Sequence, residues 1–364
     1  LLAEKIIGLK EFLSANSLQS TGTGAVKHML NTLYVTQADS HLSKEGETVV
    51  VMKEEKKLIQ IPIHTIGQII CFGYTIYVTP PLMAFCAENA ISIVWLSESG
   101  KFLGRVEGVI KGNVLLRREQ YRWADLPEKA LQIARSIVAA KVNNSRISLQ
   151  RWQRNRAAED ELVAYQVYNL AEILGRIATC ADMEKLRGLE GEAANGYFSA
   201  FDKLILQQKN YFNFSGRNRR PPRDPVNALL SFVYTLLVSD VRSSLEAVGL
   251  DPYVGYLHVD RPGRPSLALD MMEEFRAAFA DRLVLNLINL KQIQPDDFEP
   301  DSSEIRLNAE GRKKVLMAYQ SRKKEELEHP FLSEKMEIGI VFLCQARLLS
   351  RFIRGDMDFY PAMI

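Results

Sequence analysis

One histidine and two carboxylates are spaced so that they can meet at a single helix in the second half of the sequence. His258 is followed by a turn-forming segment, residues 259–265, with two prolines and one glycine, and Ser266 can cap the helix that follows. On this helix Asp270 and Glu273 are three residues apart and share one face. The turn can fold His258 back beside that face. One imidazole with two or three carboxylate oxygens suits Mn²⁺ or Mg²⁺ better than Zn²⁺, which favours cysteines or further histidines.

The same residues also fit a purely structural interpretation. Asp281 continues the acidic side of the predicted helix, opposite Met271, Phe275 and Phe279, and a row of acids is typical of a solvated helix face. His258 alone is equally typical of a loop histidine with satisfied hydrogen bonds. The residue types leave both interpretations open.

A further carboxylate, Glu190, lies on a predicted helix over 182–208. At about 100° per residue it projects within the apolar stripe, whereas Glu184 and Glu192 point away from it. A carboxylate on a buried face is costly unless a cation or a hydrogen-bond donor receives it. Glu190 is therefore either a functional carboxylate or an amphipathic one that reaches solvent or an arginine. The stripe consists of Leu186, Leu189, Ala193, Tyr197, Ala200 and Leu204.

Positive charge is concentrated although the net charge is only +2. Residues 141–156, 203–223 and 311–324 hold 17 of the 46 Lys and Arg residues and no acid. Each window alone is typical of a solvated face. Three windows with interleaved aromatic residues favour a track for a phosphate backbone. The predicted DNA-binding residues are Arg151, Arg154, Arg217, Arg219, Arg220 and Arg223.

The elements that must position these residues fall into two classes along the chain. From about residue 30 to 108, short β-branched or aromatic runs alternate with turn signals, with one helix over 80–89, which predicts a mostly β domain of two layers or one rolled sheet. After residue 113 the periodicity is helical, and Asp224 and Pro225 form an N-cap followed by a first-turn proline. The predicted helices cover 127–150, 157–180, 182–208, 225–247, 267–290, 308–328 and 331–354.

Composition excludes several classes of protein. With 47% hydrophobic and 25% charged residues the chain is not disordered, and its longest apolar stretches are shorter than the ~20 residues of a membrane span. The four cysteines are far apart and form no CxxC pair, which predicts core residues in a reducing cytosol. They are Cys71, Cys86, Cys180 and Cys344, and the remaining histidines, expected to be structural, are His28, His41, His64 and His329.

The start of the chain has a different character. Residues 1–13 have helical apolar spacing and are amphipathic, unlike a signal peptide, and residues 14–24 have the small polar composition of a linker. We expect residues 1–28 to be the tail and linker of an upstream domain.

A series of motifs makes the chain resemble a known family. They are RGLEGEAA (187–194), YF (197–198), RDPVNALL (223–230), GYLH (255–258) and LDMMEEFR (269–276). In this order they strongly resemble the CRISPR-associated spacer-acquisition integrases, from about residue 30 to the last residue. The resemblance implies an α+β fold: an N-terminal β-sandwich domain over 29–110, used for dimerisation, and a larger all-α catalytic domain over 111–364 with one divalent metal per subunit.

The resemblance also implies roles for individual residues. Glu190 and His258 align with the metal-binding glutamate and histidine, Glu273 with the third ligand and Asp270 with an acidic residue beside the metal. The third ligand is aspartate in some branches and glutamate in others, so the division between Asp270 and Glu273 stays open. The four residues form the expected catalytic set, and the ion is expected to be Mg²⁺ or Mn²⁺. Two further motif positions, Asn227 and Tyr197, are expected to support the site or the helix packing.

The implied reaction is transesterification, in which the 3′-hydroxyl of a captured DNA fragment attacks a phosphodiester at the edge of a CRISPR repeat. The implied partners are double-stranded DNA, a second copy of the chain, a small ferredoxin-like CRISPR-associated protein that bridges two dimers, and a fused RecB-like iron-sulfur nuclease upstream, all in a prokaryotic cytoplasm without membrane attachment. Two alternatives remain: a metal-dependent endonuclease or junction resolvase that uses water, and a non-catalytic DNA-binding scaffold.

Overall fold

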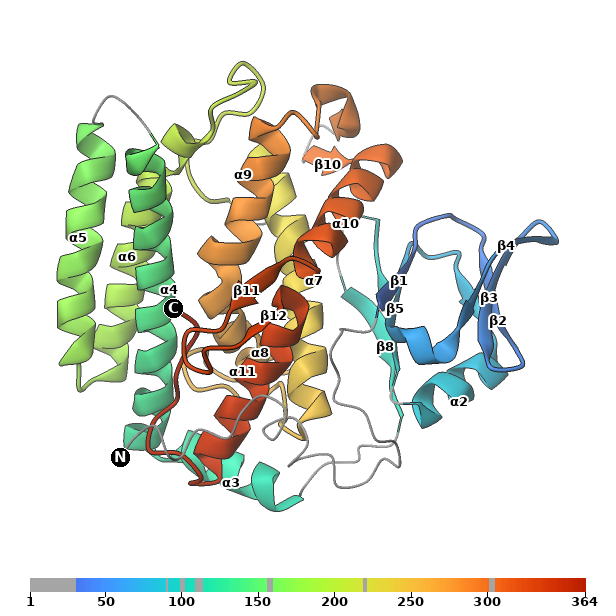
Figure 1. Cartoon of the computed structure of the whole chain (residues 1–364), viewed down its shortest axis with the longest axis horizontal. Coiled ribbons are helices and arrows are strands. Elements are labelled where there is room, and N and C mark those ends of the chain that lie inside the picture. Colours follow the sequence, from blue (N-terminus) through green and yellow to red (C-terminus); the bar gives the residue numbers. More distant parts are fainter. Residues whose placement is uncertain are drawn as a thin grey trace.

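The computed structural model describes residues 31–89, 91–98, 102–108, 114–155, 160–218, 221–300 and 305–364. The expected tail and linker at 1–28, with His28, lie outside these residues. The chain combines an N-terminal strand-rich part with a larger helical part, which lie side by side (Figure 1).

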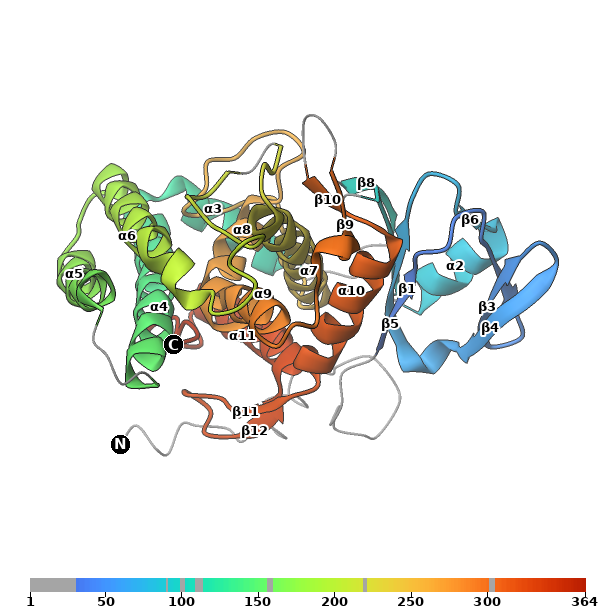
Figure 2. The same ribbon diagram turned by 90° about the horizontal axis from the view of Figure 1, so that it is seen from above.

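Two four-stranded sheets build the strand-rich part. In the first, three strands are parallel and the fourth is antiparallel, in the order β1(Asn31–Val35), β5(Ile66–Phe72), β7(Ser92–Leu96) and β8(Phe102–Val106). The second has the order β4(Lys56–Pro62), β3(Thr48–Lys53), β2(His41–Glu45) and β6(Tyr77–Val78). The helix α2(Pro80–Glu88) lies between the two sheets (Figure 2).

The first sheet is buried on both faces because its side chains alternate between two cores. Ile69 and Cys71 pack toward the second sheet and α2, whereas Ile70 and Phe72 pack into the core of the helical part. A polar contact adds to this packing, since the Gln68 amide donates to two serine hydroxyls of the helical part at 3.1 and 3.0 Å. The strand-rich part is therefore joined to the helices through one sheet face.

After α3(Val114–Asp125), the helical part forms a layer of three long helices, α4(Pro127–Arg154), α5(Glu161–Ala178) and α6(Met183–Leu204), beside a central group around α7(Pro225–Ala247) (Figure 1). Asp182 and Asp224 cap α6 and α7 by accepting from the backbone amides of Lys185 and Asn227, and the predicted N-cap and proline at the start of α7 are confirmed. The helices are α3(Val114–Asp125), α4(Pro127–Arg154), α5(Glu161–Ala178), α6(Met183–Leu204), α7(Pro225–Ala247), α8(Ser266–Met272), α9(Arg282–Asn289), α10(Ala309–Lys323) and α11(Ile338–Ile353).

The prediction of one helix over 267–290 is wrong in an informative way. Between α8 and α9 the backbone tightens into a 3-10 turn, Glu273–Phe275, and then widens into a π-helical turn, Arg276–Asp281. Such irregular turns are frequent at functional sites. The predicted Ser266 cap is also wrong, because Pro265 holds the N-cap position and the Ser266 hydroxyl donates to the Val259 carbonyl.

The helical part is not all-α as expected. Two antiparallel ribbons interrupt it, β9(Phe298–Pro300) with β10(Ile305–Leu307), and β11(Glu326–Glu328) with β12(Lys335–Glu337). The helix predicted over 331–354 begins only at Ile338. The cause is a turn at His329 and Pro330, where the His329 ring accepts from the backbone amides of Phe331 and Leu332 at 3.2 Å.

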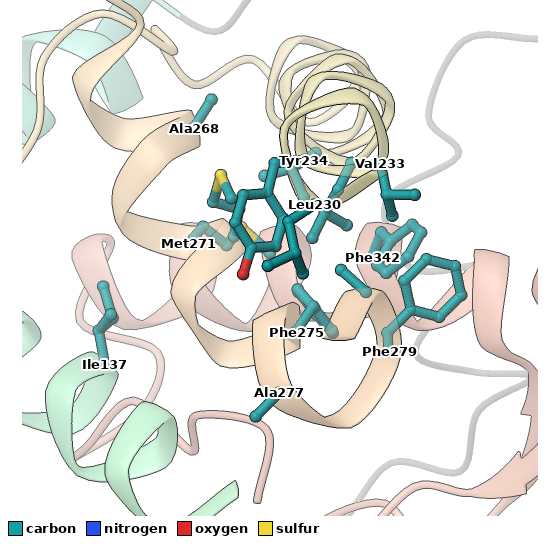
Figure 3. Close-up of a cluster of buried hydrophobic side chains, with 14 of the residues drawn as sticks. Ile137, Leu230, Val233, Tyr234, Ala268, Met271, Phe275, Ala277, Phe279 and Phe342 are labelled. Carbon is teal, nitrogen blue, oxygen red and sulfur yellow. The ribbon is translucent and has the colours of Figure 1, made fainter. Parts of the chain in front are cut away.

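Aromatic packing fixes the irregular segment against its neighbours. Phe275 and Phe279 meet Phe342 of α11 edge to face, with centroids 4.8 and 5.5 Å apart, beside Tyr234 of α7 (Figure 3). Such pairs add about 0.5–1.5 kcal/mol each beyond their buried area. This face of the segment is therefore held in the core.

The helix α7 is the only one in the described part of the chain that is long and apolar enough to span a membrane. Two thirds of its most apolar window, 67%, is buried inside the protein. Its apolarity is accounted for by its place as the central core helix (Figure 2).

Candidate metal centre

The Asp270 carboxylate organises the loop that carries His258. Fully buried, Asp270 accepts from the backbone amides of Tyr256, Leu257 and His258 at 2.6, 2.9 and 2.9 Å. Its Oδ1 also lies 2.6 Å from His258 Nδ1. With Nδ1 engaged, Nε2 is the ring nitrogen that can act as a ligand, the arrangement of histidine ligands supported by a carboxylate.

Gly255 makes this close approach possible. A β-carbon at this position would lie 2.7 Å from Ser266 Cβ and 2.9 Å from the Asp270 carboxylate. Any larger residue would therefore push the histidine loop away from α8.

Glu273 is buried next to two cations. The same Arg276 nitrogen lies 2.8 and 2.9 Å from its two oxygens, and the Lys141 ammonium lies 2.8 Å from Oε2. Burial alone would raise the pKa of Glu273, but Arg276 and Lys141 outweigh it and, with His258, lower the pKa to about 2. Glu273 is therefore ionised at neutral pH, and His258 is close enough to act on its charge.

Glu190 reaches the same place from α6. Its Oε1 contacts the ammonium of Lys141, so that one lysine of α4 bridges Glu190 and Glu273. Lys141 is 8% exposed and the Glu190 side chain 28% exposed. Glu190 therefore pairs with a buried lysine.

The four predicted residues come together as two linked pairs. Lys141 connects Glu190 with Glu273, and Asp270 holds His258 on the adjacent turn. The alternative of a solvated acidic face does not hold, because Asp270, Glu273 and Asp281 are 0%, 5% and 1% exposed.

Sequence reasoning missed Lys141, which it treated only as part of a basic window. A signal was present: Ile137, Ser145 and Leu149 lie four, four and eight residues away on α4 and are buried with it. A lysine on the buried stripe of a helix needs a carboxylate partner.

The donor set fits a hard divalent cation. Two carboxylates and one imidazole nitrogen are the ligands that Mg²⁺ and Mn²⁺ accept. Within the described ranges no three His, Cys, Asp or Glu side chains converge closely enough to hold an ion as they stand. The Lys141 ammonium lies between the Glu190 and Glu273 carboxylates and contacts both.

The predicted DNA-binding arginines divide into groups. Arg219 and Arg220 lie outside the described residues, and Arg223 is exposed. Arg217 is half-buried, and its guanidinium donates to the Asn227 amide oxygen and to Ser231, which ties it to the start of α7. Asn227 is fully buried and, as expected, supports the helix packing.

Arg151 and Arg154 are exposed and line a cavity of about 1060 Å³. Partial burial and the like charges of Arg282 and Arg154 lower the pKa of Arg151. The cavity walls also include Asn144, one helical turn after Lys141.

The four cysteines and His329, expected to be structural, are buried in the structure. All four cysteines are free and buried, and burial raises the pKa of Cys71 and Cys344 to about 12. His329 is fully buried with Nε2 2.9 Å from the Gln345 amide oxygen. Tyr197 packs edge to face on Phe201 at 5.7 Å.

Comparison with known proteins identifies the family. The family model described as CRISPR associated protein Cas1 matches residues 33–321. The chain is 47% identical to CRISPR-associated endonuclease Cas1 1 of Chlorobaculum tepidum, over 93% of this chain and 99% of that protein. It is 48% identical to CRISPR-associated endonuclease Cas1 2 of Rhodospirillum rubrum, over 92% and 98%.

Solved structures of Cas1 proteins have a similar fold. A Cas1 protein from Thermotoga maritima superposes with a TM-score of 0.78 at 25% identity, covering 91% of this chain and 99% of that one. A chain of a Cas6-RT-Cas1–Cas2 complex gives 0.79 at 25% identity, covering 94% and 37%. With its mixed α+β architecture and a carboxylate and histidine cluster in the helical part, the chain is an enzyme that belongs to the Cas1 family of CRISPR-associated endonucleases.

Proposed function

We propose that the chain is a metal-dependent DNA integrase that inserts captured DNA fragments into a CRISPR array. The observation that carries the proposal is the convergence of Glu190 and Glu273 on one buried cation position, with His258 held beside them by Asp270. The reaction joins a 3′-hydroxyl of the fragment to a repeat phosphodiester. Because one phosphodiester replaces another, no external energy source is required.

The chain's own residues prepare the site for in-line phosphoryl transfer. Glu190, Glu273 and His258 Nε2 would hold the ion, and Arg276 keeps Glu273 ionised so that its oxygens can serve as ligands. Asp270 fixes the tautomer and orientation of His258. A bound Mg²⁺ or Mn²⁺ supplies charge neutralisation at the phosphate and orients the attacking hydroxyl.

Arg151 and Arg154 supply the phosphate contacts in this proposal. Asn144, one helical turn after Lys141, also lines their cavity, which supports a DNA path that passes close to the carboxylates. Arginine contacts to phosphates carry no base code, and we expect affinity from charge and selectivity from DNA shape and partner proteins.

The assembly proposed for this chain has further members. One structural neighbour is part of a complex with Cas2, which supports a small CRISPR-associated partner for this chain. Pairing of two copies through the strand-rich part, bridging by a ferredoxin-like partner and a cytoplasmic location complete the proposal. A relative at 34% identity, covering 91% of this chain and 60% of that protein, is described as a Cas4/Cas1 fusion of Geobacter sulfurreducens, which supports an upstream nuclease domain.

The test is strand transfer of a 3′-hydroxyl DNA fragment into a repeat-containing duplex. Glu190→Ala and His258→Ala should abolish transfer while DNA binding is retained, and chelation should stop the reaction until Mg²⁺ or Mn²⁺ is added. Glu192→Ala and His64→Ala are matched controls, because Glu192 is an exposed glutamate of the same helix and His64 an exposed histidine. Normal transfer by His258→Ala would refute the assignment.

A hydrolytic activity at the same metal is the second candidate, because the relatives are described as endonucleases. A branched integration intermediate with a free 3′-end separates the two. An integrase rejoins the strands of this substrate, whereas a hydrolase only cuts it.

The DNA track has a test of its own. Arg151→Gln combined with Arg154→Gln should weaken DNA binding and reduce the slope of log K against log salt by about 2, since each phosphate contact contributes about 0.9. Arg176→Gln, at an exposed ion pair with Glu192, is the control. An unchanged slope would mean that these arginines are only solvated.

A further inference from the structure

Lys141 stands where the proposed chemistry needs a metal ion. Its ammonium contacts Glu190 Oε1 and lies 2.8 Å from Glu273 Oε2. Two oxygens that hydrogen-bond to one nitrogen lie within about 6 Å of each other. An ion with ligand distances of about 2.1 Å needs the same two carboxylates, slightly closer together.

The ammonium and a divalent ion cannot share this position. Both are cations, and the side chain of Lys141 is 9% exposed, so little water separates it from its partners. Arg276 already adds one positive charge at Glu273. A divalent ion placed beside both groups would face strong repulsion at short range.

We propose that Lys141 is the resident counter-ion of the metal centre, which holds Glu190 and Glu273 together in the metal-free protein and must leave them when the ion binds. The inference rests on the proposed metal site and deepens it. In this scheme the lysine offsets the repulsion between the half-buried Glu190 carboxylate and the buried Glu273 carboxylate before the ion arrives. It also weakens ion binding, because the ion must displace hydrogen bonds to a charged group.

The experiment measures metal binding without DNA and without turnover. Mn²⁺ is titrated calorimetrically into the full chain and into Lys141→Met, which keeps the length of the side chain and removes its charge. Because hydrogen bonds to charged groups no longer need to be broken, Lys141→Met should bind Mn²⁺ about tenfold to hundredfold tighter. Equal or weaker binding by Lys141→Met would overturn the inference.

Two controls define the site and the specificity of the effect. Lys57→Met removes an exposed lysine that pairs with Glu45 at 2.7 Å in the strand-rich part and should leave Mn²⁺ affinity unchanged. His258→Ala should lower Mn²⁺ affinity in both backgrounds. Binding that depends on His258 but not on Lys141 overturns only the counter-ion role, whereas binding that ignores His258 overturns the proposed metal site together with it.

Thermal unfolding gives a second readout. Lys141→Met should melt at a lower temperature than the parent without metal, and Mn²⁺ should raise its melting temperature by more than it raises that of the parent, because tighter binding stabilises more. A smaller rise than in the parent would contradict the proposal.

Should Lys141→Met fail to fold, the parent chain still provides a test. A crystal structure with Mn²⁺ should show Lys141 Nζ beyond hydrogen-bond distance of at least one of Glu190 and Glu273. An ion bound by both carboxylates with the ammonium still on both would overturn the inference.

Discussion

Two adjacent glutamates of this chain have the same burial and opposite electrostatics. Glu273 and Glu274 are 5% and 0% exposed. Burial raises the pKa of both, but cations surround Glu273 and lower its pKa to about 2, whereas Glu274 keeps a pKa raised to about 7. The partners of Glu274 are neutral: the Tyr360 hydroxyl at 2.6 Å, the Gln345 amide at 2.9 Å and the Met363 backbone amide at 2.8 Å.

The two carboxylates differ in the charge of their partners: Glu273 contacts cations, whereas Glu274 contacts neutral hydrogen-bond donors. Neutral donors satisfy the hydrogen-bonding capacity of Glu274 but do not compensate the cost of burying its charge. Lys141 and Arg276 do compensate it at Glu273. Glu274 ties residues 360–363 to the core, and Glu273 keeps the negative charge that the proposed metal site requires.

The largest effect is expected when the charge of Glu273 or of Glu274 is removed by substitution with glutamine. Glu273→Gln should reduce strand transfer about 10³-fold or more, because the amide loses the charge that the proposed ion requires. Glu274→Gln should retain transfer within about tenfold, since an amide can still meet neutral donors. The rates of both variants are compared in the same strand-transfer assay.

Circular dichroism shows whether each variant keeps its fold. Equal losses of strand transfer from the two substitutions would mean that the adjacent glutamates act as one structural unit. They would then not differ in their role in the reaction.

The second prediction concerns Arg276, one of the two cations that lower the pKa of Glu273. Arg276 is 6% exposed and lies over the Tyr234 ring, 4.5 Å from its centroid. Arg276→Met removes one of the positive charges that compensate the buried Glu273 carboxylate, and it should lower the free energy of unfolding by about 3 kcal/mol or more. Urea unfolding measures the change, and Arg176→Met at an exposed ion pair should change stability by less than about 1 kcal/mol.

The sequence predicts much of this fold because periodicity reports burial. Alternating runs predicted a mostly β domain before residue 108, where the structure has two sheets, and the stripe of α6 indicated a partly buried Glu190, whose side chain is 28% exposed. The Asp224 cap could also be predicted, because capping depends on local residue types.

What the sequence did not predict depends on tertiary packing. Between α8 and α9 the backbone changes to 3-10 and then to π geometry, and the helical periodicity of residues 267–290 does not indicate this change. The ion-pair partners of Lys141 could not be predicted either, because Glu190 and Glu273 are 49 and 132 positions away along the chain.

The third prediction uses the opposite pKa shifts. The folded-state pKa of Glu274, about 7, lies above its ordinary value of 4.5, so its contribution to stability is present below pH 4.5 and is lost as pH rises toward 7. For Glu273, with a pKa of about 2, stability is present above pH 4.5 and is lost only as pH falls toward 2. Between pH 5 and 7.5, Glu274 alone of the two should titrate.

Over this interval the parent should lose about 2 kcal/mol of unfolding free energy that Glu274→Gln does not lose. Urea unfolding at both pH values provides the measurement. Parallel curves for the parent and Glu274→Gln would mean that Glu274 is ionised throughout and that neutral donors suffice to hold its charge.

The smallest effect is expected at the hydroxyl that faces Glu274. Tyr360→Phe removes the donor at 2.6 Å, whose hydrogen bond lowers the pKa of Glu274, so the pKa should rise further above 7. The lost hydrogen bond should cost about 1 kcal/mol at pH 8, where the carboxylate is ionised, and less at pH 5. Tyr165→Phe is the control, because Tyr165 is 61% exposed on α5. A cost that does not change with pH would show that the hydroxyl serves packing alone, and the charge state of Glu274 would then be governed by its burial.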